Sequence, residues 1–163
     1  MTPLQRLFTK FAEGFILLKQ PFAIILAGHN GSGKSTLWRE HLSGTLKIPL
    51  INADRMMLSI LPEASKAYPL PNWAVQIRDS HPEWMKVAQK GVEAFLDQAK
   101  DKKVNFAMET VFSHWRDRGD GTFESKIDKI HQLQKSGYAV VLLFVGLKNV
   151  ETSVLREIGR AHV

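Results

Sequence analysis

The segment Gly28-His29-Asn30-Gly31-Ser32-Gly33-Lys34-Ser35 follows the pattern G-x-x-x-x-G-K-[ST]. Glycines at these positions let the backbone curve closely round a phosphate with its amide groups turned inward. Lys34 supplies a cation for the β- and γ-phosphates, and the Ser35 hydroxyl is suited to ligate Mg²⁺. The pattern therefore predicts a nucleoside triphosphate site made of Gly28, His29, Asn30, Gly31, Ser32, Gly33, Lys34, Ser35 and Thr36.

The residues on both sides of this loop support the same prediction. The apolar run Phe22–Ala27 predicts a buried strand, and Lys34–Ser43 predicts a helix whose N-terminus would favour an anion. No Asn-Lys-x-Asp segment that would read guanine occurs in the sequence, so we expect ATP rather than GTP.

Strands and helices alternate along the rest of the chain, which is typical of β-α-β units and a parallel sheet. We therefore expect an α/β fold of the P-loop NTPase type, a three-layer sandwich with a mostly parallel sheet of about four strands. The further strands are predicted at 48–52, 104–108 and 138–145, the further helices at 56–61, 83–99 and 123–135, and loops at 62–82 and 116–122.

The composition narrows the classes of function. The chain has 163 residues, a net charge of +6 and no cysteine, which excludes thiol catalysis and cysteine-ligated zinc. No apolar run approaches the roughly 18–20 residues that a bilayer requires, so we expect no membrane partner and a cytoplasmic location. The positive charge suits anionic substrates.

Residues 1–20 carry apolar side chains at helical spacing, with Phe8, Phe11 and Phe15 among them. This spacing predicts an amphipathic helix packed on the body of the domain, and a helix lying on a membrane surface is the alternative.

Two acidic residues stand at the predicted strand ends, where ligands bind in this architecture. Asp54 is a candidate general base or magnesium ligand, and its alternative role is to cap the following helix. Glu109 is a candidate for a substrate hydroxyl or the magnesium shell, and its alternative is an ion pair with a neighbouring cation. Arg116, just past the third strand, is a candidate for substrate phosphates, although loop arginines are more often simply solvated.

These motifs together resemble the zeta toxin family of P-loop kinases. The resemblance rests on the loop at 27–36, on an Asn-x-Asp after the second strand, on a Glu-Thr followed by a Ser after the third, and on a Gly-Tyr opening the fourth. The matching residues are Asn52 and Asp54, then Glu109, Thr110 and Ser113, then the run 137–147, and finally Arg156 in a lid helix.

The resemblance implies a kinase that transfers the γ-phosphoryl group of ATP to a hydroxyl of UDP-N-acetylglucosamine or a related metabolite. It implies that Lys34 holds the phosphates, that Asp54 is the general base and that Arg156 stabilises the transferring group. Glu109 and Thr110 become sugar-nucleotide contacts by the same resemblance, and an antitoxin-like protein becomes a candidate partner. The full set of expected substrate contacts is Asn52, Asp54, Glu109, Thr110, Ser113 and Arg116, with Mg²⁺ at Ser35 and Asp54.

The C-terminus departs from the family pattern. The family continues with a second lid arginine and a fifth strand, whereas residues 157–163 match the translation of a sequencing adapter. We therefore expect a kinase domain over 21–156 that lacks its C-terminal strand, followed by a foreign tail at 157–163. Three alternatives stay open: a kinase acting on nucleic-acid ends, an ATP-binding regulatory module, and an inactive fragment. Nucleic acid is a less expected binding partner than a small anionic metabolite.

Overall fold

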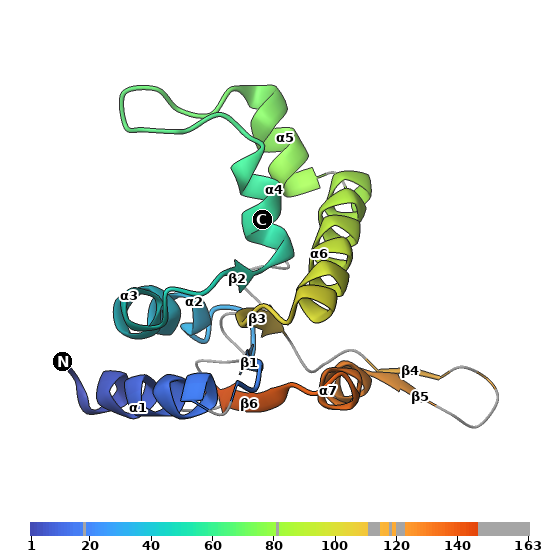
Figure 1. Cartoon of the computed structure of the whole chain (residues 1–163). Helices are drawn as coiled ribbons and strands as arrows, with labels where there is room; N and C mark the ends of the chain where they lie inside the picture. The colour runs from blue at the N-terminus through green and yellow to red at the C-terminus, as the bar shows by residue number, and fades with distance from the viewer. Residues whose placement is uncertain (18, 81, 111–114, 118, 120–122, 147–163) are drawn as a thin grey trace. The chain divides into compact units, whose positions relative to one another are not determined.

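The computed structural model describes residues 1–17, 19–80, 82–110, 115–117, 119 and 123–146 (Figure 1). The chain divides into two compact units, which we take in turn. The first comprises Met1–Leu50 and Asn105–Val163, and the second comprises Ile51–Val104.

A four-stranded sheet with the strand order β2-β3-β1-β6 forms the centre of the first unit. Strand β1 is paired in parallel with β3 on one side and with β6 on the other. The α/β fold with a parallel sheet of four strands is thus confirmed. The strands run over Leu50–Ile51 (β2), Phe106–Thr110 (β3), Phe22–Ala27 (β1) and Ala139–Phe144 (β6).

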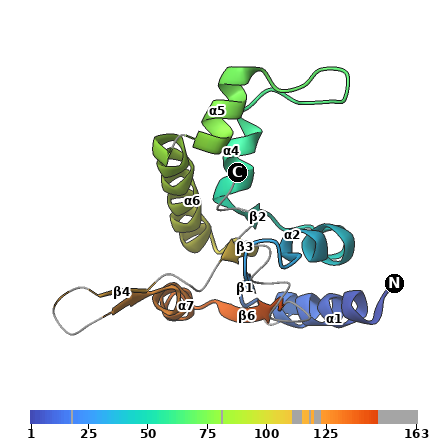
Figure 2. The same cartoon turned by 180° about the vertical axis from the view of Figure 1, so that it is seen from behind.

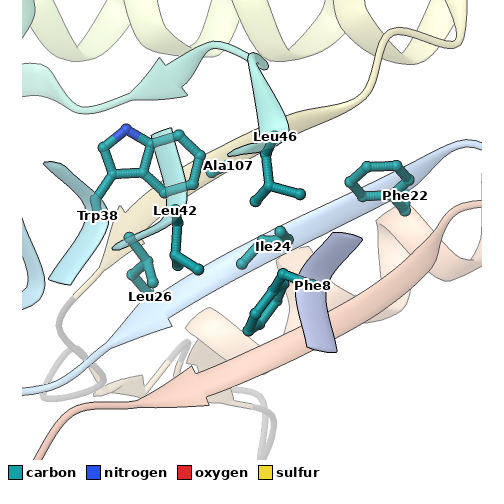
Figure 3. Close-up of a cluster of buried hydrophobic side chains, with 8 residues drawn as sticks. All are labelled: Phe8, Phe22, Ile24, Leu26, Trp38, Leu42, Leu46 and Ala107. Carbon is teal, nitrogen blue, oxygen red and sulfur yellow. The ribbon is translucent and has the colours of Figure 1, made fainter. Parts of the chain in front are cut away.

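Strand β1 is buried along its whole length because both faces of its pleat are covered. Its side chains alternate between the faces, and those of Phe22, Ile24 and Leu26 join one hydrophobic cluster. Figure 3 shows this cluster, to which the helices contribute large apolar side chains and β3 contributes Ala107. The helical members are Phe8, Trp38, Leu42 and Leu46.

The amphipathic helix expected near the N-terminus is present as α1 (Pro3–Leu17). Phe8 is buried at 3% exposure, and the ring of Phe11 lies edge-on to Phe22 with centroids 5.5 Å apart. The aromatic side of the helix is therefore part of the core.

The helix after the phosphate loop begins at Lys34, as the sequence predicts, and extends slightly beyond the predicted end at Ser43. It consists of α2 (Lys34–Leu37), a π-helical turn η1 (Trp38–Leu42) and α3 (Ser43–Leu46). Lys47 then adopts a left-handed conformation with φ of 49°, which ends the helix.

Strand β3 lies two residues further along the chain than the predicted range 104–108. The amide of Val104 still donates to the carbonyl of Ala99 at the end of a helix, and the Asn105 side chain accepts from the Phe22 amide at 2.9 Å. Strand pairing begins only after these contacts. As a result Glu109 and Thr110 belong to the strand itself, whereas the sequence placed them after it.

Two short strands after β3 correct the prediction of a loop at 116–122 and of a helix from Phe123. Strands β4 (Trp115–Asp117) and β5 (Phe123–Ser125) pair antiparallel, with Arg116 opposite Glu124. Helix α7 (Lys126–Lys135) therefore begins three residues later than expected. Figure 1 shows the hairpin leading directly into this helix.

The second unit is helical, with α4 (Ala53–Ser59), α5 (Asn72–Ser80) and α6 (Pro82–Lys102). Helix α4 lies beside α6 in both views (Figures 1 and 2). The Met56 sulfur occupies the space over Gly91. The predicted loop region over 62–82 is confirmed up to residue 71 and is wrong beyond it, because α5 and the start of α6 lie there. Pro71 accepts the first helical hydrogen bonds of α5, and Pro82 is the first residue of α6, so these prolines begin helices instead of preventing them.

Within the described residues, no helix is both long and apolar enough to cross a membrane.

Candidate active site

The phosphate loop starts at a glycine that no other residue could replace without strain. Gly28 is buried and has a φ of +148°, in the region that side chains rarely adopt. A Cβ atom at this position would overlap the carbonyl oxygen of Val145 and would lie 2.9 Å from the Ser32 hydroxyl. The Val145 amide in turn donates to the Ala27 carbonyl at 2.7 Å. The end of β6 is thereby fixed against the beginning of the loop.

Sequence reasoning did not single out Val145 as a site residue. Its contribution is made by its backbone, so its side-chain type carries no information about it. The only sequence signal is its position as the last residue of the predicted fourth strand.

Lys34 is the one buried charged side chain among the described residues, with an exposure of 7%. Its ammonium nitrogen donates to the Gly28 carbonyl at 2.8 Å and to the His29 carbonyl at 2.6 Å. Gly33, with a φ of +97°, sets the backbone direction at the start of the helix. The expected cation is therefore held inside the curve of the loop.

Ser35 in α2 and Glu109 in β3 lie close together in the first unit. The Ser35 hydroxyl lies 3.0 Å from Glu109 Oε1 and 3.1 Å from Oε2. Register explains this contact, because Glu109 lies opposite Leu26 in the ladder between β3 and β1, only two positions before the loop begins. Thr110 lies opposite Ala27 in the same ladder.

These residues fit a magnesium nucleotide. A hydroxyl and a carboxylate are the hard oxygen donors that Mg²⁺ prefers. The described residues contain no group of three or more acidic or histidine side chains suited to a metal. The Ser32 hydroxyl oxygen is buried without a hydrogen-bond partner, and so the loop also contains an unused donor.

Asn52 and Asp54 lie in the second unit, at the beginning of α4. The Asn52 side-chain oxygen accepts hydrogen bonds from the amides of Asp54 at 2.8 Å and Arg55 at 3.3 Å. Asn52 is therefore the N-cap, and the alternative of Asp54 as the cap is wrong. The Asp54 side chain is exposed in the first turn, where a negative charge is favourable.

The remaining predicted residues fall in three places. His29, Asn30 and Thr36 are exposed around the loop, and Gly31 is in a left-handed conformation there with φ of 75°. The backbone of Arg116 lies in β4. Ser113 and Arg156 lie outside the described residues.

Comparison with solved structures finds the same overall fold in a protein of low sequence identity. A candidate kinase from Chloroflexus aurantiacus matches over 88% of this chain and 68% of its own, with 17% identity and a TM-score of 0.51. The Pnkp1/Rnl/Hen1 complex matches over 84% and 39%, with 18% identity and a TM-score of 0.48. No curated protein matches the chain.

The model of the Zeta toxin family matches residues 12–162, nearly the whole chain. The chain therefore belongs to the zeta toxin family, and it is a P-loop kinase.

Proposed function

We propose that this kinase transfers the γ-phosphoryl group of ATP to a hydroxyl of UDP-N-acetylglucosamine or a closely related nucleotide sugar. The observation that supports phosphoryl transfer best is the joint placement of buried Lys34 and the Ser35–Glu109 contact at one loop. The acceptor is proposed from the family resemblance of Asn52, Asp54 and Glu109.

The donor nucleotide would be held by the chain's own cation and amides. Lys34 would place its ammonium group at the phosphate oxygens, and backbone amides of the loop between Gly28 and Gly33 would donate to the same oxygens. The carbonyls of Gly28 and His29 keep the Lys34 ammonium group inside the loop. This arrangement serves positioning and charge stabilisation, which are the main requirements of phosphoryl transfer.

The Ser35 hydroxyl and the Glu109 carboxylate would hold the magnesium ion. When bound there, Mg²⁺ supplies positive charge to the phosphate oxygens. The sequence also suggests Asp54 as a ligand. Glu109 is the carboxylate that lies within hydrogen-bond distance of Ser35, and we therefore give the metal role to Glu109.

Asp54 would then act as the general base. Its carboxylate takes the proton from the acceptor hydroxyl while that oxygen bonds to the γ-phosphorus and the bond to ADP breaks. The Asn52 cap holds the first turn of α4, and it orients Asp54 through the backbone. Arg156 would stabilise the charge on the transferring group, with Thr110, Ser113 and Arg116 as acceptor contacts.

Release of ADP from ATP and Mg²⁺ tests the proposal, with and without UDP-N-acetylglucosamine, in the native chain and in Asp54→Asn. Asp101→Asn is the matched control, because Asp101 is an exposed aspartate on α6 of the same unit. We expect sugar-dependent ADP release that Asp54→Asn abolishes and Asp101→Asn retains. ATP binding without any sugar-dependent release of ADP would refute UDP-N-acetylglucosamine as the acceptor. A parallel measurement with 5′-hydroxyl oligonucleotides would reveal a nucleic-acid acceptor.

Two further parts of the proposal do not depend on the geometry of the site. We propose that the protein works in the cytoplasm and that an antitoxin-like protein binds it. Copurification of a protein encoded beside it would test the second part.

A further inference from the structure

Strand β6 forms one margin of the four-stranded sheet, and its outer edge pairs with no other strand in the part of the chain that the structure describes. The amides of Ala139 and Val145 donate to carbonyls on the β1 side. Because the direction of the backbone groups alternates along a strand, those of Val140, Leu142 and Phe144 point away from β1. These residues therefore present backbone donors and acceptors along the outer edge.

The edge lacks the features that normally keep an exposed edge from pairing. Natural edge strands carry charged side chains, prolines or bulges. The sequence from Tyr138 to Val145 contains no charged residue and no proline, and the ladder between β6 and β1 is regular along the strand. Leu142 and Phe144 are also exposed, at 49% and 68%. The edge is thus suited to receive a further strand.

A second copy of the chain fits this edge because the outward backbone groups are symmetric about Leu142. In an antiparallel pair related by a two-fold axis, Leu142 lies opposite Leu142 of the second copy, and Val140 lies opposite Phe144. Every outward amide then meets an outward carbonyl. The side chains match as well, since the exposed leucines meet each other and the smaller Val140 leaves room for the larger Phe144.

We propose that two copies of this chain associate through the outer edges of their β6 strands, which joins their sheets into one continuous sheet. An uncharged edge suits its own copy, because a two-fold axis brings like residues together and would set any charge against itself. A charged partner segment would find no opposite charge along this strand. The backbone groups of Val145 that meet the phosphate loop point toward β1, so this pairing does not use them.

Sedimentation equilibrium of the native chain over a range of concentrations tests the proposal. A contact made by one pair of strands is small and typically weak, so we expect a reversible dimer with a Kd on the order of 10 μM. Leu142→Lys should raise this Kd at least about tenfold, because two ammonium groups would lie opposite each other across the axis. Leu7→Lys is the matched control, since Leu7 is an exposed leucine of α1 in the same unit, and it should leave the Kd unchanged.

Mixing two variants tests the register. Leu142→Glu alone should lose the dimer as Leu142→Lys does, whereas an equimolar mixture of the two should dimerise, because opposite charges then face each other. A variant that had merely lost its fold would not recover in this way. Phe144→Lys is a second variant at a more exposed position, and it should also weaken the dimer while the circular dichroism spectrum stays native.

A native chain that stays monomeric up to about 1 mM would overturn the inference. A dimer that both Leu142→Lys and Phe144→Lys leave intact would overturn it too, and so would a mixture that fails to recover from folded variants. These results do not decide the proposed kinase activity, because Leu142 and Phe144 belong to neither the nucleotide site nor the proposed acceptor contacts. Sugar-dependent ADP release by the monomeric variants should therefore equal that of the native chain.

Discussion

Substitution of Gly28 by alanine should damage the loop through two separate effects. The first is conformational, because residue 28 has a φ of +148°, and an L-residue in this region is strained by about 1–3 kcal/mol. The second is steric, because the new Cβ would overlap the backbone carbonyl of Val145 and crowd Ser32 Oγ. Overpacking of this kind destabilises by about 1–3 kcal/mol. The sum predicts a loss of roughly 2–6 kcal/mol.

The backbone of Val145 gives the overlap little room to relax. Its amide is held by the Ala27 carbonyl, and the strand that precedes it is paired with β1 along six residue pairs. Either the end of β6 separates from β1 or the loop changes its course. The first result lowers the free energy of unfolding, and the second removes the phosphate site.

Urea unfolding followed by circular dichroism measures the first result, and ATP binding measures the second. Gly44→Ala is the matched control, because Gly44 lies in α3 with nothing within 4 Å of a new Cβ. That substitution should stabilise the chain by about 0.4–1 kcal/mol. If Gly28→Ala kept both its stability within about 0.5 kcal/mol of the native chain and its affinity for ATP, the reasoning from backbone geometry would be refuted.

Four further outcomes are expected. Glu109→Gln should weaken the apparent magnesium affinity about 10–100-fold in a titration of ADP release, with little change in unfolding temperature, because the lost charge faces Ser35 and not the core. Asn52→Ala should lower the free energy of urea unfolding by about 1 kcal/mol through loss of the α4 cap. Phe8→Ala should lower it by about 3–5 kcal/mol, since this ring is buried between α1 and the sheet. Burial raises the pKa of Tyr138 above its ordinary 10.0, so the unfolded chain releases this proton at a lower pH than the folded chain, and the free energy of unfolding falls as pH rises through about 10. The unfolding temperature, measured at about pH 8 and about pH 10.5, should therefore fall less in Tyr138→Phe than in the native chain.

The class of the fold could be predicted from local sequence because its signals are short and strong. The apolar run before Gly28 and the helix start at Lys34 both lie where the sequence places them. Strand β3 was predicted less well. The pairing of β3 begins only after Asn105, whose side chain accepts a hydrogen bond from the Phe22 amide. No local sequence pattern predicts such a contact.

The two regions that were predicted wrongly show the limits of composition. Proline content suggested a loop over 62–82, but Pro71 and Pro82 stand at helix beginnings, where a missing amide does no harm. The hairpin of β4 and β5 depends on pairing between two three-residue segments, each too short to carry a period of its own.

The sequence by itself determined the phosphate loop, because glycine, lysine and serine at this spacing after an apolar run are specific for such a loop. It also determined that Asp54 and Glu109 would stand near strand ends. Tertiary structure decided which partners these residues meet. Parallel pairing of β3 with β1 sets Glu109 beside Ser35, although 74 positions separate the two in the chain. The same pairing principle brings the Val145 carbonyl against Gly28, because strand register, and not sequence distance, fixes which backbone groups become neighbours.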